Sequence, residues 1–385
     1  MNTIMISTDK NILSTGSAVG DRIVGYGKKM SALHVIVFTG KDAGFKEVQK
    51  ISANTFVHPT LSSSKYLRFY DAIRIGRRLI KSISAAMGGV NKNIVITAQD
   101  PFETSLTATC LSYLYGIPFQ LQVHTDFLSP FFYRESFLNK LRVICAKIIL
   151  PKAHGIRVVS KKIKQSLFSH FSKITKEIDV LPIFVDINRI KASSPIFNLK
   201  EKYPDFDFLI VMASRLSPEK NIQLAIRALS MVVKKYPKTG LIIIGEGERR
   251  LSLVRLVHDL KIGNSVVFEG WQENLISYYK TANLFLLSSN YEGYGMTLLE
   301  AAAAGCPIIS TDVGIAGELL APETLIKPGD LGGLVKRMEK FIASPAEREN
   351  SRKFTGRHLT GFIREKDEYA KEFVGLLSKL IPNNG

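Results

Sequence analysis

The fold is indicated most clearly by the run Leu284-Phe-Leu-Leu-Ser-Ser-Asn-Tyr-Glu-Gly-Tyr-Gly-Met-Thr-Leu-Leu-Glu300. Its first six residues are strand-like, and a turn with two glycines separates them from a helix-like stretch that continues through four alanines. Gly305 and Pro307 then mark the helix end, and the apolar stretch Ile308–Thr311 is strand-like again. A strand, a helix and a second strand in this order predict one unit of a parallel α/β sheet.

The same run has the features of a ligand site. Gly293 and Gly295 allow the backbone to approach a ligand, and the following helix presents free N–H groups and the positive end of its dipole. Glu292 comes just before this helix, and Glu300 lies roughly two turns inside it. A phosphate at the helix start, with hydroxyl-bearing groups on both sides, corresponds to a nucleotide-sugar. A core helix rich in small residues would show the same pattern, so the run alone leaves both interpretations open.

Length and composition define the broad class of protein. A chain of 385 residues with 45% apolar residues is long enough for two domains with large cores. Cys110, Cys145 and Cys306 show no metal-binding spacing and are expected to be reduced core residues of a cytoplasmic protein. Met1–Thr8 is expected to form a first strand rather than a signal peptide, and no apolar run reaches the ~20 residues that span a bilayer.

The net charge of +18 is distributed unevenly along the chain. Large apolar residues are interspersed in a basic segment from Arg134 to Lys176, which contains one acidic residue, Glu135. This mixture suits an anionic membrane surface, with a solvated helix face and a nucleic-acid-binding surface as alternatives. Because no nucleic-acid-binding motif is present, a membrane is favoured over nucleic acid as the partner of this segment. The protein is expected to be cytoplasmic and to bind peripherally to the inner face of the cell membrane. The basic residues of this segment are Arg134, Lys140, Arg142, Lys147, Lys152, Arg157, Lys161, Lys162, Lys164, Lys173 and Lys176.

Strand-like and helix-like segments alternate along the whole chain, which predicts a doubly wound parallel sheet in each half. The segments before residue 200 are Thr3–Thr8, 16–30, His34–Thr39, Tyr66–Ile83, Ile94–Thr97, Glu103–Tyr115, Phe119–Val123 and Gly155–Val159. Those after residue 200 are Phe208–Ala213, Asn221–Lys235, Leu241–Ile244, Arg249–Leu260, Ser265–Phe268, Leu275–Thr281 and Leu284–Leu287.

A polar, broken stretch at Val185–Leu199 is the expected domain boundary. The first domain is expected at residues 1–188 and the second at residues 189–364. The last segment, 365–385, is helix-like and is expected to pack back on the first domain.

Two cations come after the first strand of the second half. In Ser214-Arg-Leu-Ser-Pro-Glu-Lys-Asn221, Arg215 and Lys220 flank a turn, where both are expected to be exposed. Cations at the carboxyl end of a strand suit a leaving diphosphate, because negative charge builds on it as the glycosidic bond breaks. Two ordinary surface charges are the alternative.

Other candidates follow further strands. Gly245-Glu246-Gly247 ends a strand and either lines a nucleotide pocket or turns the chain. His124 follows the strand Phe119–Val123, at a sheet edge where ligands bind, although a lone histidine is more often structural. Gly16, Gly20, Gly25 and Gly27 do not have the spacing of a dinucleotide fingerprint, and form either a tight turn or a substrate-cradling loop.

Taken together, these residues resemble the retaining GT-B glycosyltransferases called glycosyl transferases group 1, or glycosyltransferase family four. The resemblance covers nearly the whole chain and is strongest from Ser214 to Leu320. The family's two glutamates separated by seven residues match Glu292 and Glu300. The other matches are Arg215 and Lys220 for the diphosphate-binding pair, Gly245-Glu246-Gly247 for the glycine–acidic–glycine turn, His124 for the first-domain histidine and, more loosely, Gly16 for the first-domain glycine loop.

The resemblance implies two Rossmann-like domains that face each other across a cleft. It implies a metal-independent hexosyltransferase without a cofactor, which moves a sugar from a UDP- or GDP-linked donor to a glycan or lipid-linked acceptor and retains its anomeric configuration. The implied catalytic residues are His124, Arg215, Lys220 and Glu292. The implied donor-binding residues are Gly16, Gly245, Glu246, Gly293, Tyr294, Gly295, Met296 and Glu300.

The sequence departs from the family pattern at three places. Ser288-Ser289 replaces the usual Pro-Ser, Tyr294 replaces a Phe, and Gly314-Ile-Ala-Gly317 replaces a Gly-Gly pair. These changes bear on donor-sugar selectivity. A GT-B nucleotide-sugar epimerase and a basic nucleic-acid-binding α/β protein are the alternative functions.

Overall fold

The computed structural model describes residues 1–14, 17–44, 48–89, 93–171 and 176–382, which form two compact units. The first unit combines Met1–Leu128, Ser136–Pro182 and Glu365–Gly385. The second unit combines Ser129–Glu135 and Ile183–Arg364. Within the described ranges, no helix is both long and apolar enough to cross a bilayer.

The first unit contains an eight-stranded sheet in the order β3-β4-β2-β1-β5-β6-β7-β8. All neighbouring strands are parallel except β3 and β4, which are antiparallel. The central strands are almost entirely buried because helices cover both faces of the sheet. The strands are β1 (Asn2–Ser7), β2 (Ala32–Val37), β3 (Gln49–Ser52), β4 (Thr55–Pro59), β5 (Ile94–Ala98), β6 (Phe119–Val123), β7 (Gly155–Val158) and β8 (Ile178–Val180).

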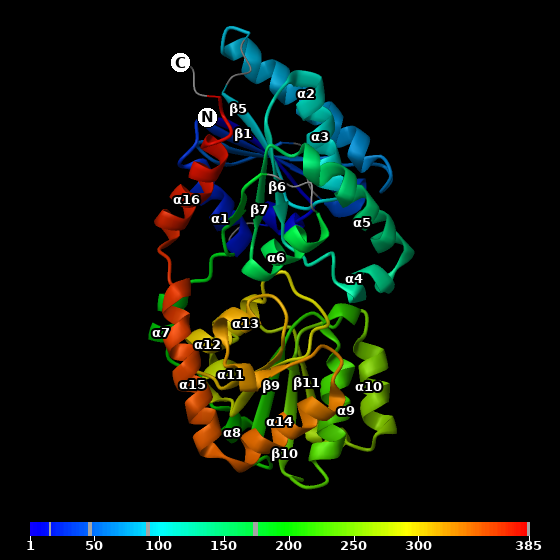
Figure 1. The fold of residues 1–385 in the computed structure, drawn as a ribbon, viewed down its shortest axis with the longest axis vertical. Helices are drawn as coiled ribbons and strands as arrows, with labels where there is room; N and C mark the ends of the chain where they lie inside the picture. The colour runs from blue at the N-terminus through cyan, green and yellow to red at the C-terminus, as the bar shows by residue number, and fades with distance from the viewer. Residues whose placement is uncertain (15–16, 45–47, 90–92, 172–175, 383–385) are drawn as a thin grey trace. The chain divides into compact units, whose positions relative to one another are not determined.

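Helices form a layer on each side of this sheet (Figure 1). On one side, α3 (Glu103–Tyr115) packs against both α2 (Arg68–Ala86) and α5 (Phe137–Ile149). On the other side, α1 (Ala18–Gly27) packs against the C-terminal helix α16 (Lys366–Ser378). The helix α6 (Lys161–His170) connects β7 to β8, and the Ser160 side chain caps its first turn.

The second unit contains a six-stranded parallel sheet in the order β11-β10-β9-β12-β13-β14. The chain runs outward from β9 to β11, returns to the other side of β9, and then runs outward again to β14. The point where the order reverses therefore lies between β9 and β12. The strands are β9 (Phe208–Ala213), β10 (Thr239–Ile244), β11 (Val266–Gly270), β12 (Leu284–Leu287), β13 (Ile308–Thr311) and β14 (Leu325–Ile326).

The helices of the second unit also form two layers (Figure 1). A core cluster that includes Ile210, Leu229 and Phe341 joins the sheet to α9 (Ile222–Val232), α10 (Arg250–Asp259) and α14 (Leu331–Ala343). The opposite layer contains α7 (Ile187–Ala192), α8 (Leu199–Lys202), α11 (Ile276–Thr281), α12 (Met296–Ala303), α13 (Ala316–Leu319) and α15 (Pro345–Leu359).

The expected α/β fold class with two parallel sheets is confirmed. Elements such as α3, β6, β9 and β12 have the predicted bounds. Several features differ from the expectation. The antiparallel strand β3 and the strands β4, β8 and β14 were not predicted. Ser129–Glu135, with α4 (Pro130–Glu135), belongs to the second unit although it falls inside the range 1–188. Gly16 lies outside the described residues.

Candidate active site

The candidate residues of the second unit follow three adjacent strands: β10, β9 and β12. In parallel sheets, ligands bind at the carboxyl ends of strands where the strand order reverses. In this sheet that point lies between β9 and β12, and the two loops that follow these strands carry Arg215, Lys220 and Glu292. The sheet topology therefore brings together residues that lie far apart in the sequence.

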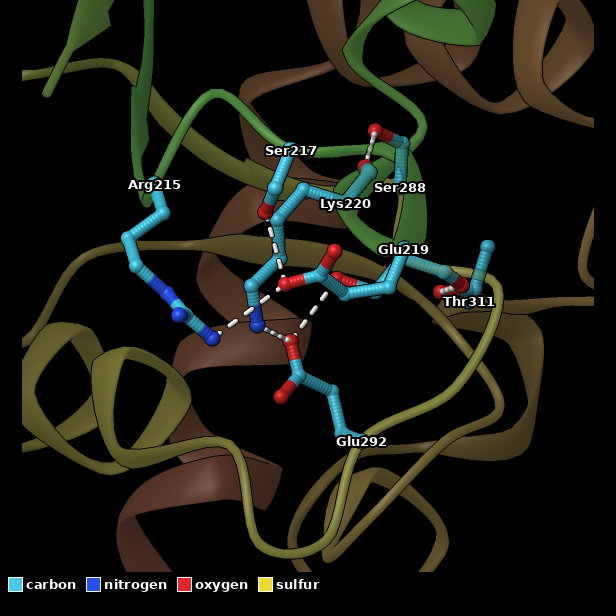
Figure 2. Close-up of polar contacts among 8 residues, drawn as sticks. Arg215, Ser217, Glu219, Lys220, Ser288, Glu292 and Thr311 are labelled. Carbon is cyan, nitrogen blue, oxygen red and sulfur yellow. Dashed lines mark hydrogen bonds and ion pairs between the residues drawn. The ribbon is translucent and has the colours of Figure 1, made fainter. Parts of the chain in front are cut away.

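The loop after β9 is held by its own polar contacts. Ser217 donates to Glu219 Oε1 at 2.6 Å, and Arg215 donates to the same oxygen at 3.3 Å. Asn221 ends the loop in the left-handed conformation with φ 45°, which asparagine tolerates better than most residues. The Arg215 side chain is 76% exposed, so its guanidinium is accessible to an anion. Figure 2 shows that the Arg215 and Lys220 side chains extend in the same direction from this loop.

Lys220 forms an ion pair with Glu292 from the loop after β12 (Figure 2). The Lys220 Nζ atom lies 2.6 Å from Glu292 Oε1, and Ser289 Oγ donates to the same oxygen at 2.8 Å. The two charged side chains are only 15% and 12% exposed. The expectation that Lys220 lies on an exposed turn was therefore wrong, because the neighbouring strand places a carboxylate over it.

Further hydrogen bonds to backbone carbonyl groups also join the two loops. Ser288 Oγ donates to the carbonyl oxygens of Lys220 and Asn221 at 3.0 Å each, and Asn290 N donates to the Glu219 carbonyl at 2.8 Å. Thr311, at the end of β13, donates to the Ser289 carbonyl at 2.7 Å (Figure 2). Ser288 and Ser289, which replace the family's Pro-Ser, thus hold the ion pair in place.

Helix α12 begins directly at this site. Gly295 precedes it with φ 90°, a conformation that favours glycine, and no side chain caps the first turn. The Tyr294 carbonyl accepts a hydrogen bond from Ile315 N at 2.9 Å. Gly314 approaches so closely that a Cβ there would lie 2.3 Å from Tyr294 O, which explains the glycine at this position. Gly293 and Tyr294 are buried, whereas Met296 is 39% exposed.

Glu300 lies on the second turn of α12 and is mostly buried. Tyr279 of α11 donates a hydrogen bond to Glu300 Oε2 at 3.1 Å. Burial raises the pKa of the Glu300 carboxyl, and the Tyr279 hydrogen bond opposes that shift. Glu292 and Glu300 thus have different partners, one a cation and the other a hydroxyl.

The loop after β10 packs against the loop after β9. Gly245 has φ 128°, and a Cβ there would lie 2.0 Å from the Ser214 carbonyl oxygen. Leu216 N donates to the Glu246 carbonyl at 2.9 Å. The Glu246 side chain is half exposed and contacts Arg250 at 3.1 Å. The glycine at position 245 is therefore needed for the turn itself, while the Glu246 carboxylate stays accessible.

His124 lies in the first unit, at the end of β6, within a network of buried polar side chains. Its Nε2 is 2.9 Å from Gln122 Oε1, which also accepts from Arg157 at 2.8 Å. Arginine can only donate, so the Arg157 contact fixes the amide orientation, and Gln122 Nε2 then donates to Thr97 Oγ1 at 2.7 Å. His124 Nε2 must then be the donor, so Nδ1 is left as an acceptor. Burial, followed by the charges of Arg157 and Arg22, lowers the His124 pKa well below its usual value, so the ring is neutral.

Asp100 and Glu103, two further acidic residues at the sheet edge of the first unit, have structural partners. Asp100 Oδ1 accepts from the backbone of Phe102 at 2.8 Å and of Thr104 at 3.2 Å, and thus opens helix α3. Burial raises the Asp100 pKa to about 6. Glu103 is paired with Arg142 at 2.7 Å. In the described part of the chain, no three His, Cys, Asp or Glu side chains are grouped so that they could hold a metal ion.

Sequence reasoning missed several residues that shape the site. Glu219 and Ser289 lie inside quoted motifs but were given no role. Tyr291, next to Glu292, donates to Glu135 Oε2 at 2.5 Å, and its ring packs edge-on against Phe132 of α4. The only signal in the sequence was the pair Ser288-Ser289 after a predicted strand, whose hydroxyl groups could have been expected to form hydrogen bonds near the site. Nothing local predicts a contact between residues 135 and 291.

Comparisons with known proteins show what this chain is similar to. Residues 196–357 match the family model described as glycosyl transferases group 1. An uncharacterized glycosyltransferase of Methanocaldococcus jannaschii is 29% identical over 194 residues, 50% of this chain and 48% of the relative. The alpha-monoglucosyldiacylglycerol synthase of Streptococcus pneumoniae is 28% identical over 214 residues, 52% of this chain and 48% of the relative. The chain spans about half the length of these relatives.

A solved structure has the same architecture. Sucrose-phosphate synthase from Thermosynechococcus elongatus aligns with a TM-score of 0.78 at 19% sequence identity, and the alignment covers 99% of each chain. This similarity concerns the GT-B fold. Together, the comparisons show that residues 196–357 are similar to the group 1 glycosyltransferase family and that the whole chain has a GT-B-like fold.

Proposed function

We propose that this protein is a retaining glycosyltransferase that moves a sugar from a nucleotide diphosphate sugar to an acceptor hydroxyl. One observation carries the proposal. Where the strand order of the second unit reverses, Arg215, Lys220, the uncapped start of α12, Glu292 and Glu300 follow two adjacent strands. This arrangement supplies positive charge for a diphosphate and two separate carboxylates for hydroxyl groups.

In the proposed donor complex, the exposed Arg215 guanidinium and the first N–H groups of α12 bind the diphosphate. The Lys220 ammonium has three N–H donors, so it can keep its contact with Glu292 and donate to a phosphate oxygen as well. As the bond to the sugar breaks, these groups stabilise the charge that develops on the leaving diphosphate.

The two glutamates have different proposed roles. Glu292 binds a hydroxyl of the transferred sugar while Lys220 and Ser289 hold its carboxylate in place. Glu300, which accepts a hydrogen bond from the Tyr279 hydroxyl, binds the ribose. For His124 we propose a contact with the sugar, in which the neutral ring acts as a hydrogen-bonding group.

We propose that the reaction needs neither a cofactor nor a metal ion, because cationic side chains and a helix start supply the positive charge. The proposed donor nucleotide is UDP or GDP. Activity is therefore expected to survive EDTA, and a loss of activity that magnesium restores would contradict this part of the proposal.

The proposed acceptor is a lipid-linked or cell-surface glycan precursor at the cytoplasmic face of a membrane. The name of the Streptococcus pneumoniae relative describes synthesis of a glycolipid. The basic segment from Arg134 to Lys176 suits an anionic lipid surface. The comparisons do not favour the alternatives, a nucleotide-sugar epimerase or a nucleic-acid-binding protein.

Ligand-induced thermal stabilisation tests donor binding. UDP, GDP, ADP and their sugars are added separately, and a matching ligand at about 100 times its Kd should stabilise the protein by about 2.7 kcal/mol. Glu300→Gln should weaken this effect, whereas replacement of the exposed Met231 on α9 should not change it. The anomeric configuration of the product, measured by proton NMR, tests retention. If none of the nucleotides or their sugars stabilises the wild type, the proposal is wrong.

A further inference from the structure

Helix α5 has two apolar faces, and only one of them packs against the first unit. Val143, Ala146 and Ile149 are buried on the inner face. The opposite face carries a stripe of large apolar residues spaced i, i+1, i+4, i+7 and i+11, which lie on one side of an α-helix. These residues are 47% to 74% exposed, and we call them the α5 stripe: Phe137, Leu138, Leu141, Ile144 and Ile148.

The α5 stripe lies in a basic environment. Lys140 and Lys147 are exposed on α5 itself, and the helix contains no acidic residue. Glu103 of the adjacent α3 is paired with Arg142, which offsets its charge. Helix α2, in the same layer (Figure 1), adds further exposed basic residues. These are Arg74, Arg77, Arg78 and Lys81.

A helix with one exposed apolar side and flanking lysines has the form of a helix that lies in a membrane interface. Isolated apolar residues are normal on protein surfaces, but five on one helix face form a contiguous patch. The α6 segment of the basic region differs, because its apolar residues Ile163 and Leu167 are buried and Phe168 is its single exposed large apolar residue. The apolar side chains and the charges are therefore combined on α5.

We propose that the α5 stripe is the docking surface of this protein for an anionic lipid bilayer, with its apolar side chains inserted among the lipids. Docking would bring the protein to a lipid-linked acceptor, and this part of the proposal rests on the proposed function. The docking itself is argued only from the exposed residues of α5. A second copy of the chain fits this face poorly, because its net charge of +18 would repel the same basic surroundings. Nucleic acid would leave the apolar side chains of the α5 stripe exposed to water.

Vesicle cosedimentation tests the proposal on the full chain. The probes are phosphatidylcholine vesicles with and without phosphatidylglycerol, each at low and raised salt. The wild type should bind the anionic vesicles, and Phe137→Ser/Leu141→Ser/Ile144→Ser should bind them at least about tenfold more weakly. Met231→Ser/Leu251→Ser, which replaces exposed apolar residues in the second unit, is the matched control and should bind like the wild type.

A fluorescence measurement tests insertion directly. Trp271 is the single tryptophan of the chain, so Trp271→Phe gives a silent background. In that background, Ile144→Trp should be quenched by brominated lipid, whereas Met231→Trp should not. These substitutions replace exposed side chains, so the fold is expected to persist.

Several outcomes would overturn the proposal. The wild type could fail to bind anionic vesicles. Alternatively, the serine variant could bind them as tightly as the wild type, which would mean that binding is purely electrostatic and does not need the α5 stripe. Light scattering could instead show a wild-type oligomer that the serine variant dissociates, which would assign the stripe to self-association. Donor binding, measured by thermal stabilisation on the same variants, is independent of vesicle binding, so failure of the proposed function can be recognised separately.

Discussion

The ion pair between Lys220 and Glu292 predicts that two cations on one loop differ in their effect on stability. Both Lys220→Met and Arg215→Met should lower turnover by about a hundredfold, because each removes a positive charge from the site proposed to bind the leaving diphosphate. Only Lys220→Met should also destabilise the second unit. Arg215 is the matched control, since it lies on the same loop but its side chain is 76% exposed.

The expected magnitude follows from burial and geometry. Removing one partner of a fully buried ion pair costs about 3–5 kcal/mol, and exposed pairs contribute about 0–1 kcal/mol. Lys220 and Glu292 are 15% and 12% exposed, and Ser289 still donates to Glu292 after the lysine is lost. We therefore expect Lys220→Met to destabilise the unit by about 2–3 kcal/mol. Arg215→Met, which loses a 3.3 Å contact in solvent, should cost less than about 0.5 kcal/mol.

Hydrogen exchange is the suitable assay, because a chain with two units does not unfold in a single step. Peptides from β9 and β12 report on the stability of the sheet that carries both loops. In Lys220→Met their exchange should be about 30- to 150-fold faster than in the wild type. The double variant Lys220→Met/Glu292→Gln should recover about 1–2 kcal/mol relative to the sum of the single variants.

The opposite result is easy to recognise. If β9 and β12 exchange as slowly in Lys220→Met as in Arg215→Met, the ion pair does not stabilise the unit. If the double variant is no better than additive, Lys220 and Glu292 act independently despite their 2.6 Å contact.

Three further predictions concern other parts of the molecule. Gly314→Ala should destabilise the protein by about 1–3 kcal/mol in thermal unfolding, because φ is 54° and the new Cβ would lie 2.3 Å from Tyr294 O; an unchanged Tm would contradict this. In steady-state kinetics, Glu300→Gln should mainly raise KM for the donor and Glu292→Gln should mainly lower kcat, since in the proposed donor complex only Glu292 contacts the transferred sugar; equal effects on both constants would refute the division. Burial lowers the His58 pKa to about 4, so the unfolded chain, with a histidine pKa of about 6.5, binds the proton first as pH falls, and up to about 3 kcal/mol of stability should be lost between pH 6.5 and 4. His58→Gln should lose measurably less in urea unfolding over that range, and an identical loss would rule out this histidine as a cause.

Much of the fold was predictable because secondary structure depends on local patterns. Buried strands have local patterns, a continuous apolar run in β9 and β12 and an alternation of apolar residues with glutamine in β6, so all three could be placed to the residue. Helix starts and ends carry their own signals, such as Gly295 before α12. The antiparallel β3 was missed because Gln49–Ser52 is short and polar and has no apolar run.

The candidate site was predictable only in part. The types of residue after each strand indicated positive charge and carboxylates, and the family resemblance supplied their proposed roles. The solvent exposure and the contacts of each side chain were not predictable, because both depend on neighbouring residues from other loops. Lys220 was expected on the surface, yet a carboxylate 72 residues later in the chain covers it.

The sequence by itself determined which segments are strands, helices and turns, and which loops carry charge, because these properties depend on residues within a few positions of one another. The tertiary structure decided which loops meet. It paired Lys220 with Glu292, placed Gly314 against Tyr294, joined Glu135 to Tyr291 and linked Arg157 to Tyr369. These contacts depend on strand order and on close packing between distant segments, and no local pattern of residues encodes either one.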